Sequence, residues 1–318
     1  MNWKQWTRPW EPSGEPSSAR TVLYSLLRRS VELTGIIALS FGTSQAETLR
    51  FATWNIENFW HVPGESLRGP YRGRDTVRET EDYGRIRELI DQVNADVWAL
   101  QELGSPAAAE FLFPPTDWTL VFSPRYDPQN RRDIYTALAV AKDAAQVIAQ
   151  DEIALNVTGG LRTGTAAQIE VGPRRLWVAS IHLKAGCRWD PLESDRAGCA
   201  TLANQVPHLE AWIDRHSEAG FLLGGDFNRQ LLGHPFYAEG FDDVWLDLND
   251  DPDAPLALFP FDMMVPCEAY DEEPSAPIDF IVTPGWIALA SPPGPHVIDH
   301  PHRGTSDHCP VVLEISFP

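Results

Sequence analysis

Several short apolar runs in the sequence begin or end with a side chain that can bind a metal ion or transfer a proton. Each of these side chains stands where an apolar run meets a loop: they are Asn55 in WNIEN, Glu102 in QE, His182 in SIHLK, Asp226 and Asn228 in GGDFN, Asp279 in IDF, and Asp307 and His308 in SDH. Carboxylate and imidazole groups together hold divalent cations and move protons. A single carboxylate beside a turn would mean little, because Asp is a common turn residue. Six such strand ends in one chain predict a catalytic site.

The apolar runs themselves are typical of short β-strands. They are bounded by Gly, Pro and Asp, and they are LRFATWNI, DVWALQE, WTLVFS, YTALAVA, AAQIEV, LWVASIHL, FLLGGDF, IDFIV and PVVLEIS. Two segments have helical periodicity instead: residues 81–93 place Tyr83, Ile86, Leu89, Ile90 and Val93 on one face, and residues 200–216 do the same with Leu202, Val206, Leu209, Trp212 and Ile213. Strands outnumber helices, which predicts an α/β fold of two sheets packed face to face with helices outside.

The charge of the chain limits the kinds of partner it can hold. Its 318 residues include 45 acidic side chains against 25 Lys plus Arg, a formal net charge of −20. Proteins that grip nucleic acid by bulk charge need clustered cations, so a histone-like or repressor-like function is excluded. The hydrophobic content of 43% and the charged content of 22% are those of an ordinary globular protein.

The first 46 residues resemble a targeting segment. Arg28 and Arg29 precede an apolar stretch over 33–42, which ends in the small-residue sequence Ser44-Gln45-Ala46. This is the layout of a secretory signal, and the apolar stretch is too short to span a bilayer. We therefore expect residues 1–46 to be a leader, with an N-terminal helix and tail as the alternative. We expect no membrane span after its removal, and a secreted or periplasmic protein.

Four cysteines form an even set that suits an exported protein: Cys187, Cys199, Cys267 and Cys309. Cys187 and Cys199 are close in sequence across a polar loop, so we expect them to pair and to leave Cys267 with Cys309. Free thiols and a zinc site are the alternatives. No C-x-x-C occurs, and the spacings match no structural zinc module.

The order of the motifs resembles the endonuclease/exonuclease/phosphatase superfamily, the fold of the pancreatic-type deoxyribonucleases. The resemblance covers about residues 49–317 and rests on WNIEN, QE, SIHLK, GGDFN, IDF and SDHCP in that order. It implies a four-layer sandwich of two mainly antiparallel sheets flanked by helices, with one catalytic domain over 47–318. It also implies metal-assisted hydrolysis of phosphoesters.

The resemblance implies a metal site at three of these positions. Glu102 is the expected main Mg²⁺ ligand, with Mn²⁺ as a substitute, because a carboxylate is a hard ligand for a hard cation. Asn55 is expected to help place the metal or the phosphate. Asp307 is expected to add a second carboxylate.

Five further residues are the expected catalytic group. By the same resemblance, Asp226 orients or deprotonates the attacking water and Asn228 donates a hydrogen bond to a phosphate oxygen. His308, held in one tautomer by Asp279, contacts the scissile phosphate, and His182 donates a second hydrogen bond to it.

Arginines and one tyrosine are weaker candidates for phosphate binding. Relatives use a Tyr or Arg ahead of the fourth strand, and Arg132 or Tyr135 would supply it here. The insertion over 67–78 carries Arg68, Arg72, Arg74 and Arg78, which could follow a phosphate backbone. A surface loop without that role is the alternative.

Two other clusters of polar residues carry possible metal ligands. Asp247, Asn249, Asp250, Asp251 and Asp253 would suit a structural Ca²⁺, but they do not follow the EF-hand order, so a solvated acidic loop is favoured. His296, His300 and His302 are expected in an exposed loop beside the site, with weak metal affinity as an alternative.

The fold alone does not select a substrate. The sequence lacks the aromatic-Cys-Asp-Arg run of inositol phosphatases and the long apolar hairpin expected of a sphingomyelinase. We therefore expect a monomeric, exported nuclease acting on DNA, with RNA as a further substrate. The alternatives are a phosphodiesterase or phosphatase for lipid, inositol or other small phosphoesters, and a non-catalytic binding protein on the same scaffold.

Overall fold

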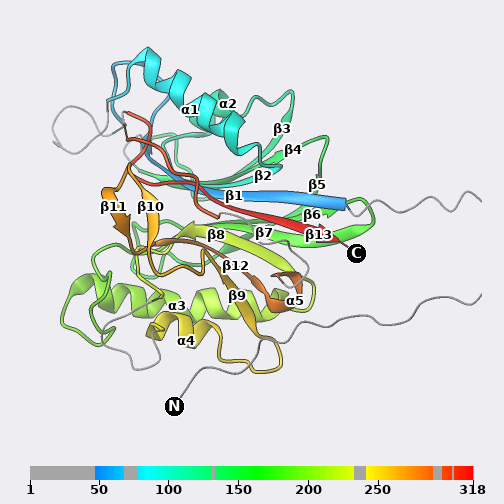
Figure 1. Ribbon diagram of the computed structural model, residues 1–318, viewed down its shortest axis with the longest axis vertical. Coiled ribbons are helices and arrows are strands. Elements are labelled where there is room, and N and C mark those ends of the chain that lie inside the picture. The colour runs from blue at the N-terminus through cyan, green and yellow to red at the C-terminus, as the bar shows by residue number, and fades with distance from the viewer. Residues whose placement is uncertain are drawn as a thin grey trace, which may run out of the picture. The chain divides into compact units, whose positions relative to one another are not determined.

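Two β-sheets pack face to face, and helices cover the outer side of each (Figure 1). The computed structural model describes residues 47–67, 77–129, 133–232, 241–288, 296–302 and 304–317. The proposed leader, residues 1–46, lies outside the described residues. Among the helices that are described, none is long and apolar enough to cross a membrane.

The first sheet has five strands in the order β13-β1-β2-β4-β3. Its strands are β1 (Glu47–Phe59), β2 (Val97–Leu103), β3 (Trp118–Phe122), β4 (Tyr135–Ala141) and β13 (Val311–Phe317). β1 and β2 are parallel, and the other neighbours are antiparallel. β13 pairs with β1 over its whole length, so the end of the described chain closes one edge of this sheet.

The second sheet has six strands in the order β5-β6-β7-β8-β12-β9. Its strands are β5 (Gln146–Ile153), β6 (Gly164–Val171), β7 (Arg174–His182), β8 (Phe221–Asp226), β9 (Leu256–Phe259) and β12 (Asp279–Pro284). Only β7 and β8 run parallel. A separate two-stranded ribbon is formed by β10 (Val265–Cys267) and β11 (Asp271–Ser275).

Three apolar clusters hold the layers together. The facing sides of the two sheets meet in one cluster, in which Phe51 and Leu138 of the first sheet lie with Val178, Leu222 and Ile281 of the second. On the outer side of the first sheet lie α1 (Thr80–Val93) and α2 (Pro106–Leu112). The second sheet carries α3 (Ala197–His216) and α4 (Asp243–Leu248), and the short helix α5 (Gly285–Ala288) follows β12. The predicted four-layer sandwich is confirmed.

The helical periodicities are confirmed as well. Every residue expected on the apolar face of the first helix is buried in α1, and every residue expected on that of the second is buried in α3. The shorter elements α2, α4, β5, β9, β10 and β11 were not predicted. They are too short or too polar for a clear period: β11, for example, reads DEEPS. Asp247, expected in an acidic loop, lies on α4.

The strand registers bring the polar strand ends to one edge of the molecule. In the second sheet His182 is the partner of Asp226 across β7 and β8, and Asp226 is the partner of Asp279 across β8 and β12. In the first sheet Asn55 is the partner of Gln101, the residue before Glu102. Because the two sheets stack, these two rows of side chains face each other.

Both predicted disulfides are present. Cys187 pairs with Cys199, which joins the loop after β7 to the start of α3, and Cys267 pairs with Cys309. The second bond attaches the β10–β11 ribbon to the residue that follows His308. No free cysteine remains.

Gly225 of β8 provides a test of the packing between neighbouring strands. A Cβ at this position would collide with the backbone carbonyl oxygen of Ile181 on β7. We expect Gly225→Ala to lower the free energy of unfolding by about 1–3 kcal/mol, measured by urea denaturation. Gly84→Ala is the matched control, because Gly84 lies on the exposed side of α1 with open space around it. That change is expected to raise the stability by about 0.5–1 kcal/mol. Equal effects of the two substitutions would contradict the strand packing described here.

Candidate active site

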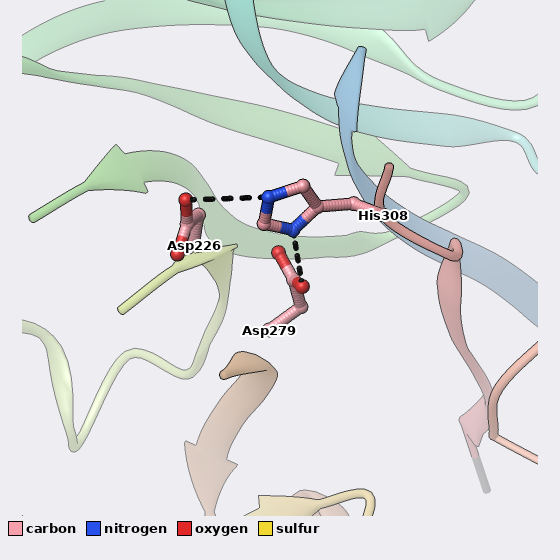
Figure 2. A group of neighbouring side chains, drawn as sticks. All are labelled: Asp226, Asp279 and His308. Carbon is pink, nitrogen blue, oxygen red and sulfur yellow. Dashed lines mark hydrogen bonds and ion pairs between the residues drawn. The ribbon is translucent and has the colours of Figure 1, made fainter. Parts of the chain in front are cut away.

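The imidazole of His308 lies between two carboxylates, one at each ring nitrogen (Figure 2). Its Nδ1 donates a hydrogen bond of 2.7 Å to Oδ2 of Asp279, and its Nε2 lies 4.0 Å from Oδ2 of Asp226. Burial would lower the pKa of His308, but the negative charges of Asp279, Asp226 and Asp307 together raise it well above its ordinary value. His308 therefore carries a proton that it can offer to a substrate oxygen.

Asp226 is almost completely buried at the end of β8. Its Oδ2 accepts hydrogen bonds from the side-chain amides of Asn55 at 3.0 Å and Asn228 at 2.9 Å, and its Oδ1 accepts one from the backbone N–H of Asn228 at 2.7 Å. Burial raises the pKa of Asp226 to about 7, and the positive charge of His308 counteracts this rise. A carboxyl with such a pKa exchanges its proton near neutral pH, as a general base must.

His182 ends β7 beside the same carboxylate. Its Nε2 lies 3.3 Å from Oδ2 of Asp226 and 3.8 Å from Oε1 of Glu102. The side chain is only 4% exposed. His182 therefore connects the carboxylates of the two facing sheets.

Glu102 and Asn55 form the part of the site that belongs to the first sheet. Asn55 Nδ2 donates to Glu102 Oε1 at 3.3 Å, and the backbone N–H of Asn58 donates to Glu102 Oε2 at 2.8 Å. Glu102 and Asn58 have φ values of +62° and +47°, a left-handed backbone that costs energy in residues other than glycine. The Glu102 carboxylate near the end of β2 is thus positioned by a backbone conformation that β-strand residues rarely adopt.

The surroundings of Glu102 fit a divalent cation. Burial raises the pKa of Asp307, the positive charge of His308 counteracts this rise, and the negative charges of Glu57 and Glu102 add to it. A hard cation such as Mg²⁺ would relieve this repulsion and would find oxygen donors in Glu102, Asp307 and Asn55.

A second set of possible ligands is formed by Asp226, Asp279 and His308, whose donor atoms all lie within 4.8 Å of one another. In the described part of the chain this is the one such cluster of His, Cys, Asp and Glu atoms. The raised pKa of His308 keeps a proton on the imidazole, which suits proton transfer. Carboxylate oxygens and an imidazole nitrogen are also donor types that hold divalent cations.

The loop before β13 is fixed by contacts to β1. Trp54 Nε1 donates to the carbonyl of His308 at 2.8 Å, and Ser306 Oγ donates to the carbonyl of Asn55 at 2.6 Å. His300 also contacts the His308 carbonyl, through Nε2 at 2.9 Å. His300 was expected to be exposed, but it is only 8% exposed because it supports this loop.

Arg78 corrects one expectation about the insertion over 67–78. It is 1% exposed, and it donates to the backbone carbonyls of Ile56 at 2.8 Å, Gly304 at 3.0 Å and Thr305 at 2.5 Å. The prediction that Arg78 contacts a phosphate backbone is therefore wrong: it ties β1 to the loop of His308. Arg68, Arg72 and Arg74 lie outside the described residues.

The remaining phosphate-binding candidates are only partly placed. Tyr135 starts β4 and is 1% exposed; its hydroxyl accepts a hydrogen bond of 3.3 Å from the backbone N–H of Asp127, and the rings of Phe122 and Tyr126 pack against it. Arg132 lies outside the described residues. A phosphate contact at either position stays a prediction.

In the acidic segment after α4, side-chain oxygens accept hydrogen bonds from backbone N–H groups of the same segment. Asn249 Oδ1 accepts from the N–H of Leu256 at 2.7 Å, and Asp251 Oδ1 accepts from that of Asp253 at 2.9 Å. The two other histidines of the last loop also have partners: His296 contacts the Val312 carbonyl at 3.1 Å, and His302 contacts Glu57 at 2.8 Å.

Arg188 was missed by the sequence analysis. It lies in the loop after β7, and the negative charges of Asp226 and Asp279 act on it while burial lowers its pKa. The signal that could have identified it is its place directly after Cys187, a residue expected to be fixed by a disulfide five residues beyond a catalytic histidine.

Comparisons with known proteins identify the family of this chain. The family model described as the Endonuclease/Exonuclease/phosphatase family matches residues 52–308. That range includes every catalytic and metal-binding candidate. The chain belongs to the endonuclease/exonuclease/phosphatase family. A search of curated proteins finds no match.

Solved structures confirm the fold. The TDP2 protein of D. rerio, in a structure described as complexed with a single-strand DNA product, is 15% identical, with 85% of this chain and 99% of that chain covered and a TM-score of 0.58. A family protein from Bacteroides vulgatus is 14% identical, with coverages of 85% and 99% and a TM-score of 0.56. The human Nocturnin catalytic domain is 16% identical, with coverages of 86% and 96% and a TM-score of 0.55.

The pairing of His308 with Asp279 makes a pH-dependent prediction. We expect Asp279→Asn to lower the pKa of His308 strongly, because the nearest negative charge is lost while burial remains. The measurement is an NMR titration of the imidazole in chelator. A raised pKa in the folded state stabilises the fold fully below the unfolded pKa of about 6.5, and this contribution is lost as the pH rises through the folded pKa. The variant should lack that stability at low pH.

Asp91→Asn, an exposed change on α1, is the control and should leave the titration of His308 as it is. If the pKa of His308 were the same in the Asp279→Asn protein as in the wild type, the Asp279 carboxylate would not be the group that raises it.

Proposed function

We propose that the protein is an exported, divalent-metal-dependent phosphodiesterase, and that it is a nuclease that hydrolyses DNA and RNA phosphodiester bonds. Membership of the family supports hydrolysis of phosphoesters. The observation that carries the proposal is the charged imidazole of His308, which lies between Asp279 and Asp226, the carboxylate that also accepts a hydrogen bond from Asn55.

Glu102, Asp307 and Asn55 are the proposed holders of Mg²⁺ or Mn²⁺. When bound, the cation supplies neutralisation of charge on the phosphate oxygens. Two hydrogen bonds keep the Glu102 carboxylate in one orientation. The backbone N–H of Asn58 donates one, and the side-chain amide of Asn55 donates the other.

The other residues divide the proton transfers. Asp226 accepts a proton from the attacking water, for which a pKa of about 7 is suited. His308 donates a hydrogen bond to the phosphate and passes its proton to the leaving oxygen as the P–O bond breaks, while Asp279 holds its ring in place. His182 and Asn228 donate further hydrogen bonds, which stabilise the negative charge that grows on the phosphate oxygens.

Nucleic acid is the proposed substrate, and the proposal is supported by a protein of the same fold, D. rerio TDP2, whose structure is described as complexed with a single-strand DNA product. Export is supported by the two disulfides, which form in oxidising compartments, and by the leader-like sequence over 1–46.

A phosphodiesterase for lipid phosphoesters is the second candidate, and one observation favours it. Phe261, Met263 and Met264, between β9 and β10, are 66%, 61% and 56% exposed. Exposed apolar groups of this kind suit contact with a lipid surface. A purely binding role has less support, because all the catalytic candidates that the structure describes lie together at one edge.

The assay is hydrolysis of plasmid DNA, RNA, sphingomyelin and inositol phosphates with Mg²⁺ or Mn²⁺, with and without chelator. We expect nucleic acid to be cleaved only with metal. His308→Ala should lower kcat by about 10²–10⁴-fold, the usual contribution of a general acid or base. Glu102→Gln should instead raise the metal concentration that gives half activity by about tenfold or more.

His208→Ala is the matched control, because His208 is exposed on α3, and it should keep wild-type activity. Full Mg²⁺-dependent activity of the His308→Ala protein would refute the mechanism. Cleavage of sphingomyelin but not of nucleic acid would select the lipid candidate.

A further inference from the structure

Arg188 lies between two exposed aromatic rings beside the catalytic residues. Its guanidinium carbon is 5.4 Å from the ring centroid of Trp189 and 5.0 Å from that of Tyr270. It donates to the Tyr270 hydroxyl and, at 3.1 Å, to the carbonyl of Ala276. Trp189 is 49% exposed and Tyr270 42%, so part of each ring faces solvent. We call these three side chains the aromatic clamp.

The loop that carries Arg188 and Trp189 is rigidly held. Arg229, completely buried, donates to the carbonyls of Cys187 at 2.7 Å and Asp190 at 2.9 Å, one on each side of the pair. The backbone N–H of Gln230 donates to the Arg188 carbonyl at 3.0 Å. The Cys187–Cys199 disulfide fixes the same loop to α3. A binding surface that is held in place before the ligand arrives loses little entropy on binding.

The clamp borders a pocket that reaches the catalytic residues. The pocket is lined by Arg188 and Tyr270 together with Asp279 and His308, and its wall includes the apolar side chains of Val265 and Val297. Arg188 Nε is buried, and it has no hydrogen-bond partner among the described residues. A flat group attached to the phosphate that contacts His308 would therefore meet apolar walls, two rings and a free N–H donor.

The charge around the clamp discourages a second nucleic-acid strand. Between Gln230 and His302 the sequence has no Lys or Arg and 14 acidic residues. Glu268 and the acidic residues of β11 are exposed on the ribbon next to Tyr270. Phosphates that passed over this ribbon would be repelled. A base that stacks on a ring needs no such charge, because stacking acts through the uncharged π-face.

We propose that Trp189, Arg188 and Tyr270 bind an unpaired nucleobase next to the phosphate that is hydrolysed, so that the protein acts on single-stranded nucleic acid in preference to duplex. The inference rests on the proposed nuclease function. Bases in a duplex are stacked and paired with each other, so they reach such a clamp only after they leave the helix, which costs free energy.

The test has a binding part that needs no turnover. A labelled single-stranded DNA and its duplex are titrated with the full chain in chelator at low salt, and the dissociation constants are measured by fluorescence anisotropy. We expect the single strand to bind at least about tenfold more tightly. Trp189→Ala and Tyr270→Ala should each weaken that binding about tenfold or more, the effect of losing one stacking ring. Trp189→Phe and Tyr270→Phe should restore most of it, since both keep a ring.

Trp286→Ala is the matched control. Trp286 is 54% exposed on α5, which follows the end of β12 opposite Asp279. This variant should bind the strand as the wild type does. Equal binding of duplex and single strand, or full single-strand binding by the two alanine variants, would overturn the inference. So would Trp189-dependent binding to phosphatidylcholine–phosphatidylserine vesicles without binding to the strand.

The kinetic part separates the inference from the proposed function. kcat/KM is measured with Mg²⁺ on the complete strand and on the same strand made abasic at one nucleotide beside the cleavage position. The ratio of kcat/KM on the complete strand to kcat/KM on the abasic strand should be about tenfold lower in the Trp189→Ala protein than in the wild type. Absence of any hydrolysis by the wild type would refute the nuclease function, whereas the binding result decides on the clamp in either case.

Discussion

Asp226 and Asp279 stand directly opposite each other across β8 and β12, and two like charges at such a distance destabilise a sheet. The protonated ring of His308 lies at both carboxylates and compensates this repulsion. The same three groups that make the end of the sheet tolerable thus form the centre of the candidate site. Loss of the positively charged imidazole of His308 would leave the two carboxyl groups without their neutralising partner. The stability of the sheet and the transfer of protons therefore depend on the same interaction.

This interaction needs His308 to be held by parts of the chain that are remote in sequence. Trp54 and Arg78 bind backbone carbonyls of the loop of His308, and the Cys267–Cys309 bond joins that loop to the β10–β11 ribbon. The fixed ribbon in turn carries Tyr270 to Arg188. Support of the catalytic histidine and the shape of the neighbouring pocket are therefore produced by the same few contacts.

The sequence was sufficient for the sandwich and for most of the site, because motif residues at strand ends and apolar periods in α1 and α3 are local signals. It misled about Arg78 and His300, whose burial depends on the loops that fold over them. It pointed to Arg188 only through the neighbouring Cys187, since a charged residue in a polar loop has no period and the contact with the distant Tyr270 cannot be read from the sequence. A pattern along the sequence does not show contacts between segments that are far apart in the chain.

The first and last strands of the described chain are neighbours: β1 pairs with β13 from Glu47 with Phe317 to Thr53 with Val311. During synthesis β1 is made long before its partner β13, and such long-range pairings form slowly. The loop of His308 comes directly before β13. A ribosome-bound chain that has not yet released these residues contains Glu102, His182 and Asp226 but not the imidazole between the carboxylates. The candidate site is therefore assembled only after the loop of His308 and β13 have been made, although most of its side chains are made much earlier.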